Sequence, residues 1–251
     1  MNREDAKRLV QGFLGKQQVP DFGLEEPGKI LPLRPMLEKL VKLSEMEFGL
    51  YAWSREPLEG KFDREQKLHY ILEAGRCGRK EAALLKEEHK TGDPDLIARN
   101  MGLKVFTPDT PSGGGHVIFA QYVEPDEVTI FMDGVERAQR LIEDHSLGKL
   151  LENLDVKSLL LAHEIFHGVE YRKADSIYTR TEKVELWKRP FSNKSGLVCL
   201  GEIAGMEFAR EMLGISFSPY VLDVLLMYGY QEDAATALYE EIMDMAQMAA
   251  E

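Results

Sequence analysis

Residues 159 to 170 read L-L-L-A-H-E-I-F-H-G-V-E, an apolar stretch that carries two histidines and a glutamate near its middle. His163 and His167 stand four positions apart, and on an α-helix this spacing places both imidazoles on one face, where they can converge on one metal ion. Glu164 lies about 100° around the helix from His163. The spacing therefore predicts a buried helix that presents a metal site to a cavity.

Two histidine ligands and a nearby glutamate are typical of zinc hydrolases. Zinc with two histidines and one carboxylate keeps a fourth position for water and lowers the pKa of that water toward about 7. Glu164 is predicted to be the general base that takes the proton of this water during attack on a carbonyl. Ligation would also satisfy polar groups that are costly to bury unpaired. The alternative is that both histidines are ordinary core or surface residues.

The third metal ligand must come from another segment. Residues 201 to 209, G-E-I-A-G-M-E-F-A, place a carboxylate among apolar and small residues, and we predict Glu202 as the third ligand of a Zn²⁺ site formed with His163 and His167. The small neighbours of Glu202 would let the two helices approach closely: Gly201, Ala204 and Gly205. Glu207 is about 140° away on the helix and is expected on a solvated face. The alternative for Glu202 is a surface glutamate.

A site that hydrolyses a peptide bond also needs a donor for the developing oxyanion. The sequence leaves four candidates open: His116, Tyr122, Tyr171 and Tyr178. The remaining histidines fall on polar helical faces and are expected at the surface: His69, His89 and His145.

Composition narrows the function classes. The chain has 251 residues, 44% of them hydrophobic and 29% charged, which predicts a folded globular protein of one large domain or one domain with an appendage. The net charge of −12 argues against general binding to nucleic acids or anionic membranes, which Lys and Arg capture. The two isolated cysteines, the charged N-terminus and the lack of a span of about 20 apolar residues predict a cytoplasmic protein.

The patterning predicts an α+β fold, mostly helical, with a small three-stranded sheet packed on the helix of the two histidines. Helices are expected over residues 3–14, 35–53, 63–74, 79–90, 94–102, 133–145, from 155 through the stretch 159–170, 196–213, from 218, and from 233. The G-R-C-G sequence at 75–78 is interpreted as a break, and Asp63, Asp93, Asp133 and Asp155 as helix caps. Strands are expected over 103–107, 116–123 and 128–132.

Over residues 94 to 213 the order of motifs resembles the ImmA/IrrE family of metallopeptidases. The resemblance includes D-L-I-A-R-N-M-G-L-K-V before a strand, then V-T-I-F-M, L-A-H-E-I-F-H and E-I-A-G-M-E-F-A-R-E-M-L. It implies a zincin-like domain over residues 94–251, with His163, His167 and Glu202 as ligands and Glu164 as general base. Residues 1–93 form a helical N-terminal region outside the resemblance. The chain departs from the family at Phe166, where glycine is common.

The resemblance further implies a cytosolic protease whose substrate is a protein or peptide, such as a helix-turn-helix repressor, with no direct contact to nucleic acid or membrane. The sequence suggests three alternatives. A helix-turn-helix at 98–102 conflicts with the strand and the prolines that follow it. A di-iron bundle needs a second E-x-x-H, which the sequence lacks. A non-catalytic, metal-stabilised binding module of the same fold stays open.

Overall fold

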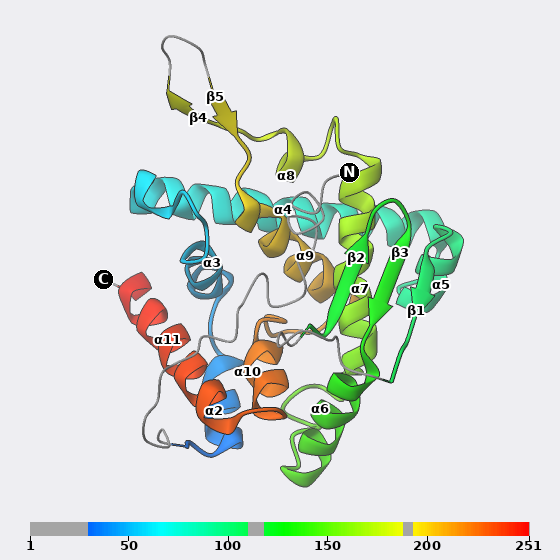
Figure 1. The fold of residues 1–251 in the computed structure, drawn as a ribbon, viewed down its shortest axis with the longest axis vertical. Helices are drawn as coiled ribbons and strands as arrows, with labels where there is room; N and C mark the ends of the chain where they lie inside the picture. The colour runs from blue at the N-terminus through cyan, green and yellow to red at the C-terminus, as the bar shows by residue number, and fades with distance from the viewer. Residues whose placement is uncertain (1–29, 110–117, 188–192, 251) are drawn as a thin grey trace.

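The computed structural model describes residues 30–109, 118–187 and 193–250. Both histidines lie on one helix, α7 (Val156–Arg172), around which the other elements are arranged. The side chain of Asp155 caps the helix by accepting a hydrogen bond from the backbone N–H of Ser158, as predicted. Residues 159 to 170 are all buried, because the small sheet packs on one side of α7 and helix α9 (Val198–Leu213) on another (Figure 1).

The three predicted strands form one mixed sheet beside α7, which confirms an α+β class. They are β1 (Lys104–Phe106), β2 (Ala120–Val123) and β3 (Glu127–Ile130), in the order β1-β3-β2. Strand β3 pairs parallel to β1 and antiparallel to β2, across the short E-P-D-E turn. Strand β2 is therefore an edge strand, and it contacts α7 directly.

The break predicted at residues 75 to 78 is wrong, because one helix, α4 (Arg64–His89), runs through it. Asp63 caps this helix as predicted, in a reciprocal capping box with Gln66. The glycines serve close packing instead. A Cβ on Gly78 would lie 2.0 Å from the backbone oxygen of Ala204 in α9, so only glycine allows the two helices to come this close.

The single helix predicted over 35–53 is two helices, α2 (Leu33–Leu40) and α3 (Glu45–Trp53). The cause is local. The Ser44 side chain accepts a hydrogen bond from the backbone N–H of Glu47, whose own carboxylate accepts one from the backbone N–H of Ser44. This capping box starts a new helix at Glu45.

The remaining elements follow the predicted order, with two additions between α7 and α9. They are η1 (Glu59–Lys61), α5 (Pro94–Asn100), α6 (Met132–Asp144), α8 (Tyr178–Thr181), β4 (Val184–Trp187), β5 (Asn193–Ser195), α10 (Val221–Tyr228) and α11 (Glu232–Ala250). Strands β4 and β5 pair as an antiparallel hairpin that projects from the body of the protein (Figure 1). The sequence reading did not anticipate this hairpin or α8. The helix predicted over residues 3–14 lies outside the described residues.

Asp133 does not cap helix α6, whose N-cap is Phe131. Its carboxylate instead accepts hydrogen bonds from Arg137, one turn along the helix, and from the hydroxyl of Tyr230. A carboxylate in the first turn still interacts favourably with the helix dipole.

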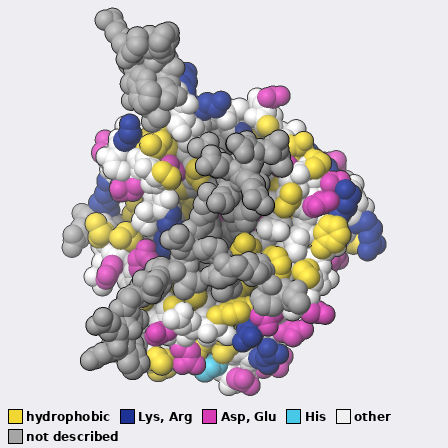
Figure 2. All heavy atoms as spheres, viewed as in Figure 1, with side chains coloured by type: hydrophobic (Ala, Val, Ile, Leu, Met, Phe, Trp, Pro, Cys, Tyr) yellow, Lys and Arg dark blue, Asp and Glu magenta, His cyan; other side chains and the backbone are white. Residues whose placement is uncertain are grey.

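The described parts of both predicted regions share one hydrophobic core, which extends from Leu33 to Ile242. Helix α4 from the N-terminal region packs extensively on α9, and α3 packs on α11. Within the described residues, no helix is long and apolar enough to cross a membrane. On the face in Figure 2, the described Lys and Arg side chains are interspersed with Asp and Glu and do not form one basic surface.

Candidate metal centre

The two histidines of α7 point their Nε2 atoms at each other. His163 is fully buried, His167 is 7% exposed, and their Nε2 atoms are 3.2 Å apart. Two ligands about 2.05 Å from a tetrahedral zinc ion lie about 3.3 Å from each other. The separation of the two imidazoles is therefore that of a ligand pair on one ion.

Helix α9 brings Glu202 to the same point. The Nε2 atom of His163 lies 3.4 Å from Oε2 of Glu202, and the Nε2 atom of His167 lies 3.9 Å from Oε1. Among the described residues, these three side chains form a group that could hold a metal ion. Oε1 of Glu202 is buried and has no hydrogen-bond partner within the described part of the chain. The three predicted ligands thus meet, and they leave an acceptor that a cation would satisfy.

Small residues let α9 come this close to α7, as the sequence predicted. A Cβ on Gly205 would lie 2.9 Å from Cε1 and 3.0 Å from Nδ1 of His163, and a Cβ on Gly201 would lie 3.2 Å from Oε1 of Glu170. The imidazole of His163 therefore rests against the bare backbone of Gly205. Any larger residue there would displace the ring.

The second nitrogen of His167 is held by another carboxylate on α7. Its Nδ1–H donates to Oε2 of Glu170 at 3.0 Å, because a carboxylate can only accept. Burial lowers the pKa of His167, yet the Glu170 hydrogen bond and the charge of Glu202 raise it to about 9. Burial raises the pKa of Glu170, but the interaction with His167 outweighs it and keeps that pKa below its usual range. By contrast, burial dominates at His163 and lowers its pKa.

Glu164, the predicted general base, is fully buried beside this group. Neither of its carboxylate oxygens has a side-chain hydrogen-bond partner among the described residues, and the nearby backbone of Tyr122 acts to lower its pKa. Burial raises the pKa of Glu164 to about 8, with His167 opposing the shift and the charge of Glu202 adding to it. A buried carboxylate without a partner is costly unless it has a task that requires it.

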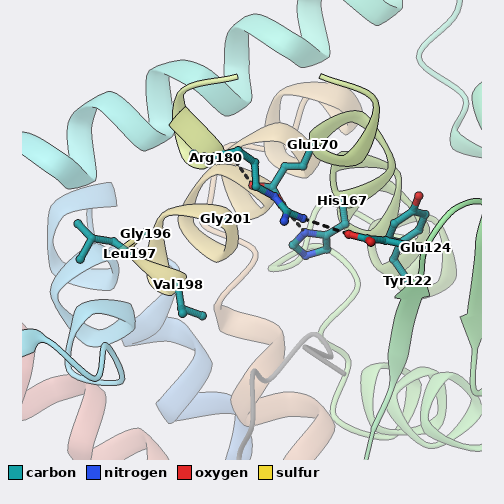
Figure 3. A pocket seen from close by; sticks show the side chains of 10 residues that line it. Tyr122, Glu124, His167, Glu170, Arg180, Gly196, Leu197, Val198 and Gly201 are labelled. Carbon is teal, nitrogen blue, oxygen red and sulfur yellow. Dashed lines mark hydrogen bonds and ion pairs between the residues drawn. The ribbon is translucent and has the colours of Figure 1, made fainter. Parts of the chain in front are cut away.

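A cavity of about 290 Å³ opens beside His167 (Figure 3). One wall comes from strand β2 and the turn after it, and the opposite wall from the start of α9: Tyr122 and Glu124, then Leu197 and Val198. Arg180 lies between two carboxylates, 3.7 Å from Glu124 and 3.7 Å from Glu170. Of the three candidate ligands, His167 is the one that lines this cavity.

The structure separates the oxyanion candidates. Tyr122 lines the cavity, but its hydroxyl donates to the backbone oxygen of Pro125, and burial raises its pKa to about 12. Tyr171 is 41% exposed. The hydroxyl of Tyr178 is buried, and the charges that act on it after burial come from Glu182, Tyr70 and Glu73 rather than from the metal ligands. His116 lies outside the described residues.

The sequence reading missed Tyr220, which lies just before α10. Its hydroxyl is buried without a partner in the described part of the chain, and burial followed by the charge of Glu202 raises its pKa. Its ring stacks on Phe48 with centroids 5.7 Å apart. Nearby, Asp223 accepts a hydrogen bond of 2.9 Å from Tyr51. Only the tertiary fold brings these residues toward Glu202, so the sequence carried no signal for them.

Glu207 corrects one prediction, because it is not on a solvated face. It is 3% exposed, and it pairs with Arg79 of α4 at 2.5 Å and with Arg210 at 3.5 Å. Glu45 of α3 pairs with the same Arg79 at 2.9 Å. The sequence did not indicate that α4 packs on α9 and brings Arg79 to Glu207. For this reason Glu207 was predicted to lie in solvent.

Comparisons with protein-family models, with curated proteins and with solved structures found no match to this chain.

Proposed function

We propose that this protein is a zinc-dependent metallopeptidase that hydrolyses a peptide bond through water activated by Glu164. The observation that carries the proposal is one arrangement of four side chains. One donor atom from each of three side chains lies within 4.8 Å of the others, the two Nε2 atoms being 3.2 Å apart, and beside them the buried carboxylate of Glu164 has no side-chain hydrogen-bond partner among the described residues.

The donor set fits zinc. Two imidazole nitrogens and one carboxylate leave a fourth position of a tetrahedron free, as catalytic zinc sites do. When bound, zinc supplies Lewis acidity, which lowers the pKa of water and polarises a peptide carbonyl. The unpartnered Oε1 of Glu202 and the cradle that Gly205 provides for His163 are features that such an ion would use.

Glu164 would act on the proton of the attacking water. The protein's own groups raise its pKa to about 8, chiefly through burial, and a cation held by the three ligands would lower this pKa and favour the ionised carboxylate, which is the form that can accept a proton. General acid–base catalysis of this kind contributes about 10²–10⁴-fold to a rate. The same group, once protonated, can return its proton to the amine that leaves.

The edge strand β2 supports a peptide as substrate. Tyr122 in this strand lines the cavity beside His167, and an edge strand offers backbone hydrogen bonds to an extended chain. Leu197 and Val198 give the opposite wall apolar contact. The family resemblance extends the proposal to a regulatory protein such as a helix-turn-helix repressor, cut in the cytoplasm, where the free and buried Cys77 and Cys199 would stay reduced.

The test combines metal content with cleavage. Purified protein is expected to hold one zinc per chain, and His163→Ala is expected to lose it. Cleavage of a peptide library by the zinc-loaded wild type is then compared with cleavage by Glu164→Gln, which should retain zinc and lose at least about 100-fold in rate. Glu207→Gln is the matched control, because Glu207 is buried on α9 but pairs with arginines.

Each outcome discriminates. Zinc in the wild type with no cleavage by either protein would favour the metal-stabilised binding module. Equal cleavage by the wild type and Glu164→Gln would contradict the assigned base. Absence of bound metal would overturn the proposal as a whole.

A further inference from the structure

We infer that Glu170 is a positioning residue for the metal site: it fixes the tautomer and ring orientation of His167, and Thr179 fixes Glu170. This inference rests on the metal site of the proposed function, although it does not depend on the reaction. Glu170 is not itself among the candidate ligands, because its carboxylate meets the far side of the imidazole.

Glu170 determines which tautomer His167 adopts. A histidine that ligates through Nε2 must carry its proton on Nδ1, and in a neutral imidazole the proton stays on the nitrogen that has an acceptor. The Nδ1 atom of His167 lies 3.0 Å from Oε2 of Glu170, while its Nε2 faces His163. Glu170 thus selects the tautomer that leaves Nε2 free to ligate.

Glu170 also fixes the orientation of the His167 ring. Glu170 and His167 lie three positions apart on α7, where side chains of neighbouring turns meet. Both are buried, so the hydrogen bond is shielded from competing water. The imidazole plane is therefore held by a bond at Nδ1 in addition to packing.

Glu170 is itself held in place. Its other oxygen, Oε1, accepts a hydrogen bond from the hydroxyl of Thr179, which is 5% exposed, and it lies 3.7 Å from Nε of Arg180. Figure 3 shows the side chains of Arg180, Glu170 and His167 gathered at one end of the cavity. Gly201 of α9 leaves the space that this carboxylate fills, since a Cβ there would lie 3.2 Å from Oε1.

The short helix α8 therefore positions Glu170, a role that its sequence did not indicate. It places Thr179 against Glu170, which in turn contacts the candidate ligand His167. Thr179 would therefore act through Glu170 and not by direct contact with the ion. Outer partners of metal ligands typically contribute 10–100-fold to metal affinity.

The experiment measures the affinity of the full chain for Co²⁺, through its visible absorption, and for Zn²⁺ by competition. Glu170→Ala is expected to weaken binding by about 10–100-fold. Glu170→Gln keeps an acceptor for Nδ1–H without the charge, so its loss should be smaller. Thr179→Val should have the smallest effect. Glu207→Gln, a change at an equally buried glutamate on α9, should bind both ions as the wild type does.

A second readout separates positioning from general stability. The Nδ1 proton of His167, held in a buried hydrogen bond, should give a downfield proton resonance in zinc-loaded wild type that disappears in Glu170→Ala. Metal affinity of Glu170→Ala equal to that of Glu207→Gln would overturn this inference and leave the metal site intact. A wild type that binds neither ion would overturn both this inference and the proposed function.

Discussion

Glu202 and Glu207 lie five positions apart on helix α9, both largely removed from water, yet their surroundings differ. Glu207 pairs with Arg79 and Arg210, so its charge is compensated by the protein. Glu202 faces two imidazoles and retains an oxygen without a partner among the described residues. A buried carboxylate that the fold neutralises is structural, whereas one that the fold leaves partly unsatisfied beside two imidazoles is a candidate cation ligand.

The difference between Glu202 and Glu207 is tested most directly by replacing each of them with alanine. Glu202→Ala removes one of three ligands, and since zinc sites bind with about 10–16 kcal/mol in total, the loss should be about 3–5 kcal/mol, or about 10²–10⁴-fold in affinity. Glu207→Ala should bind zinc normally and lose about 1–3 kcal/mol of unfolding free energy, because Arg79 keeps Glu45. Calorimetric titration and urea denaturation measure the two effects. A reversed pattern would refute the assignment.

Adding zinc tests the same difference between the two glutamates, through the stability that the bound ion confers. Zinc at 100 times its dissociation constant should raise the unfolding free energy of the wild type by about 2.7 kcal/mol. The Glu207→Ala protein should gain the same increment from a lower starting point, and the His163→Ala protein should gain none. Thermal melts with and without zinc, followed by chelation, check this expectation. An equal gain in the His163→Ala protein would place the zinc elsewhere.

Two glycines sharpen the comparison through packing. Gly78→Ala would push a Cβ to 2.0 Å from the backbone of Ala204, so it should cost about 1–3 kcal/mol of stability. Gly205→Ala would meet the ring of His163 at 2.9 Å, so it should lower zinc affinity more than stability. Denaturation and zinc titration of both variants would separate these effects. Loss of zinc affinity in Gly78→Ala alone would contradict the division between the two contacts.

The last expected effect is a change of stability with pH that arises at Asp223, another buried carboxylate. Burial raises its pKa to about 8, although the Tyr51 hydrogen bond opposes the shift. Because the folded pKa lies above the unfolded value, the folded state binds more protons, and stability falls as pH rises from about 4 to about 8. Asp223→Asn removes this slope, which is at most about 1.4 kcal/mol per pH unit.

Urea denaturation of the wild type and Asp223→Asn at pH 5, 6, 7 and 8 tests this directly. The stability of the variant relative to the wild type should increase with pH. A difference that is constant over this range would show that Asp223 ionises equally in both states.

The sequence predicted that the candidate ligands would lie together, because local spacing determines which face of a helix a residue occupies. His163 and His167 needed only the four-residue interval, and the small residues around Glu202 indicated close helix packing. Helix caps at Asp63, Asp93 and Asp155 were also confirmed, since a cap is a contact within a few residues.

The errors share one cause, which is that a distant segment decided the outcome. Gly75 and Gly78 were predicted to break the helix, because the local sequence is rich in glycine. In the structure the helix is continuous, and these positions leave room for Glu45 beside Gly75 and for α9 beside Gly78. Glu207 was predicted to lie on a solvated face, but Arg79 of the distant helix α4 pairs with it. Glu170 follows the second histidine by three positions and could have been found from that interval, whereas Thr179 could not, because its role depends on how α8 folds back.

The long packing of α4 against α9 has a practical consequence for anyone who shortens this protein. A fragment that starts at residue 94 would retain all three candidate ligands and the base, so its sequence would look sufficient. It would nevertheless strip away the guanidinium of Arg79 and uncover apolar surface along the helix that holds Glu202. We expect such a fragment to precipitate on expression and not to yield a minimal enzyme.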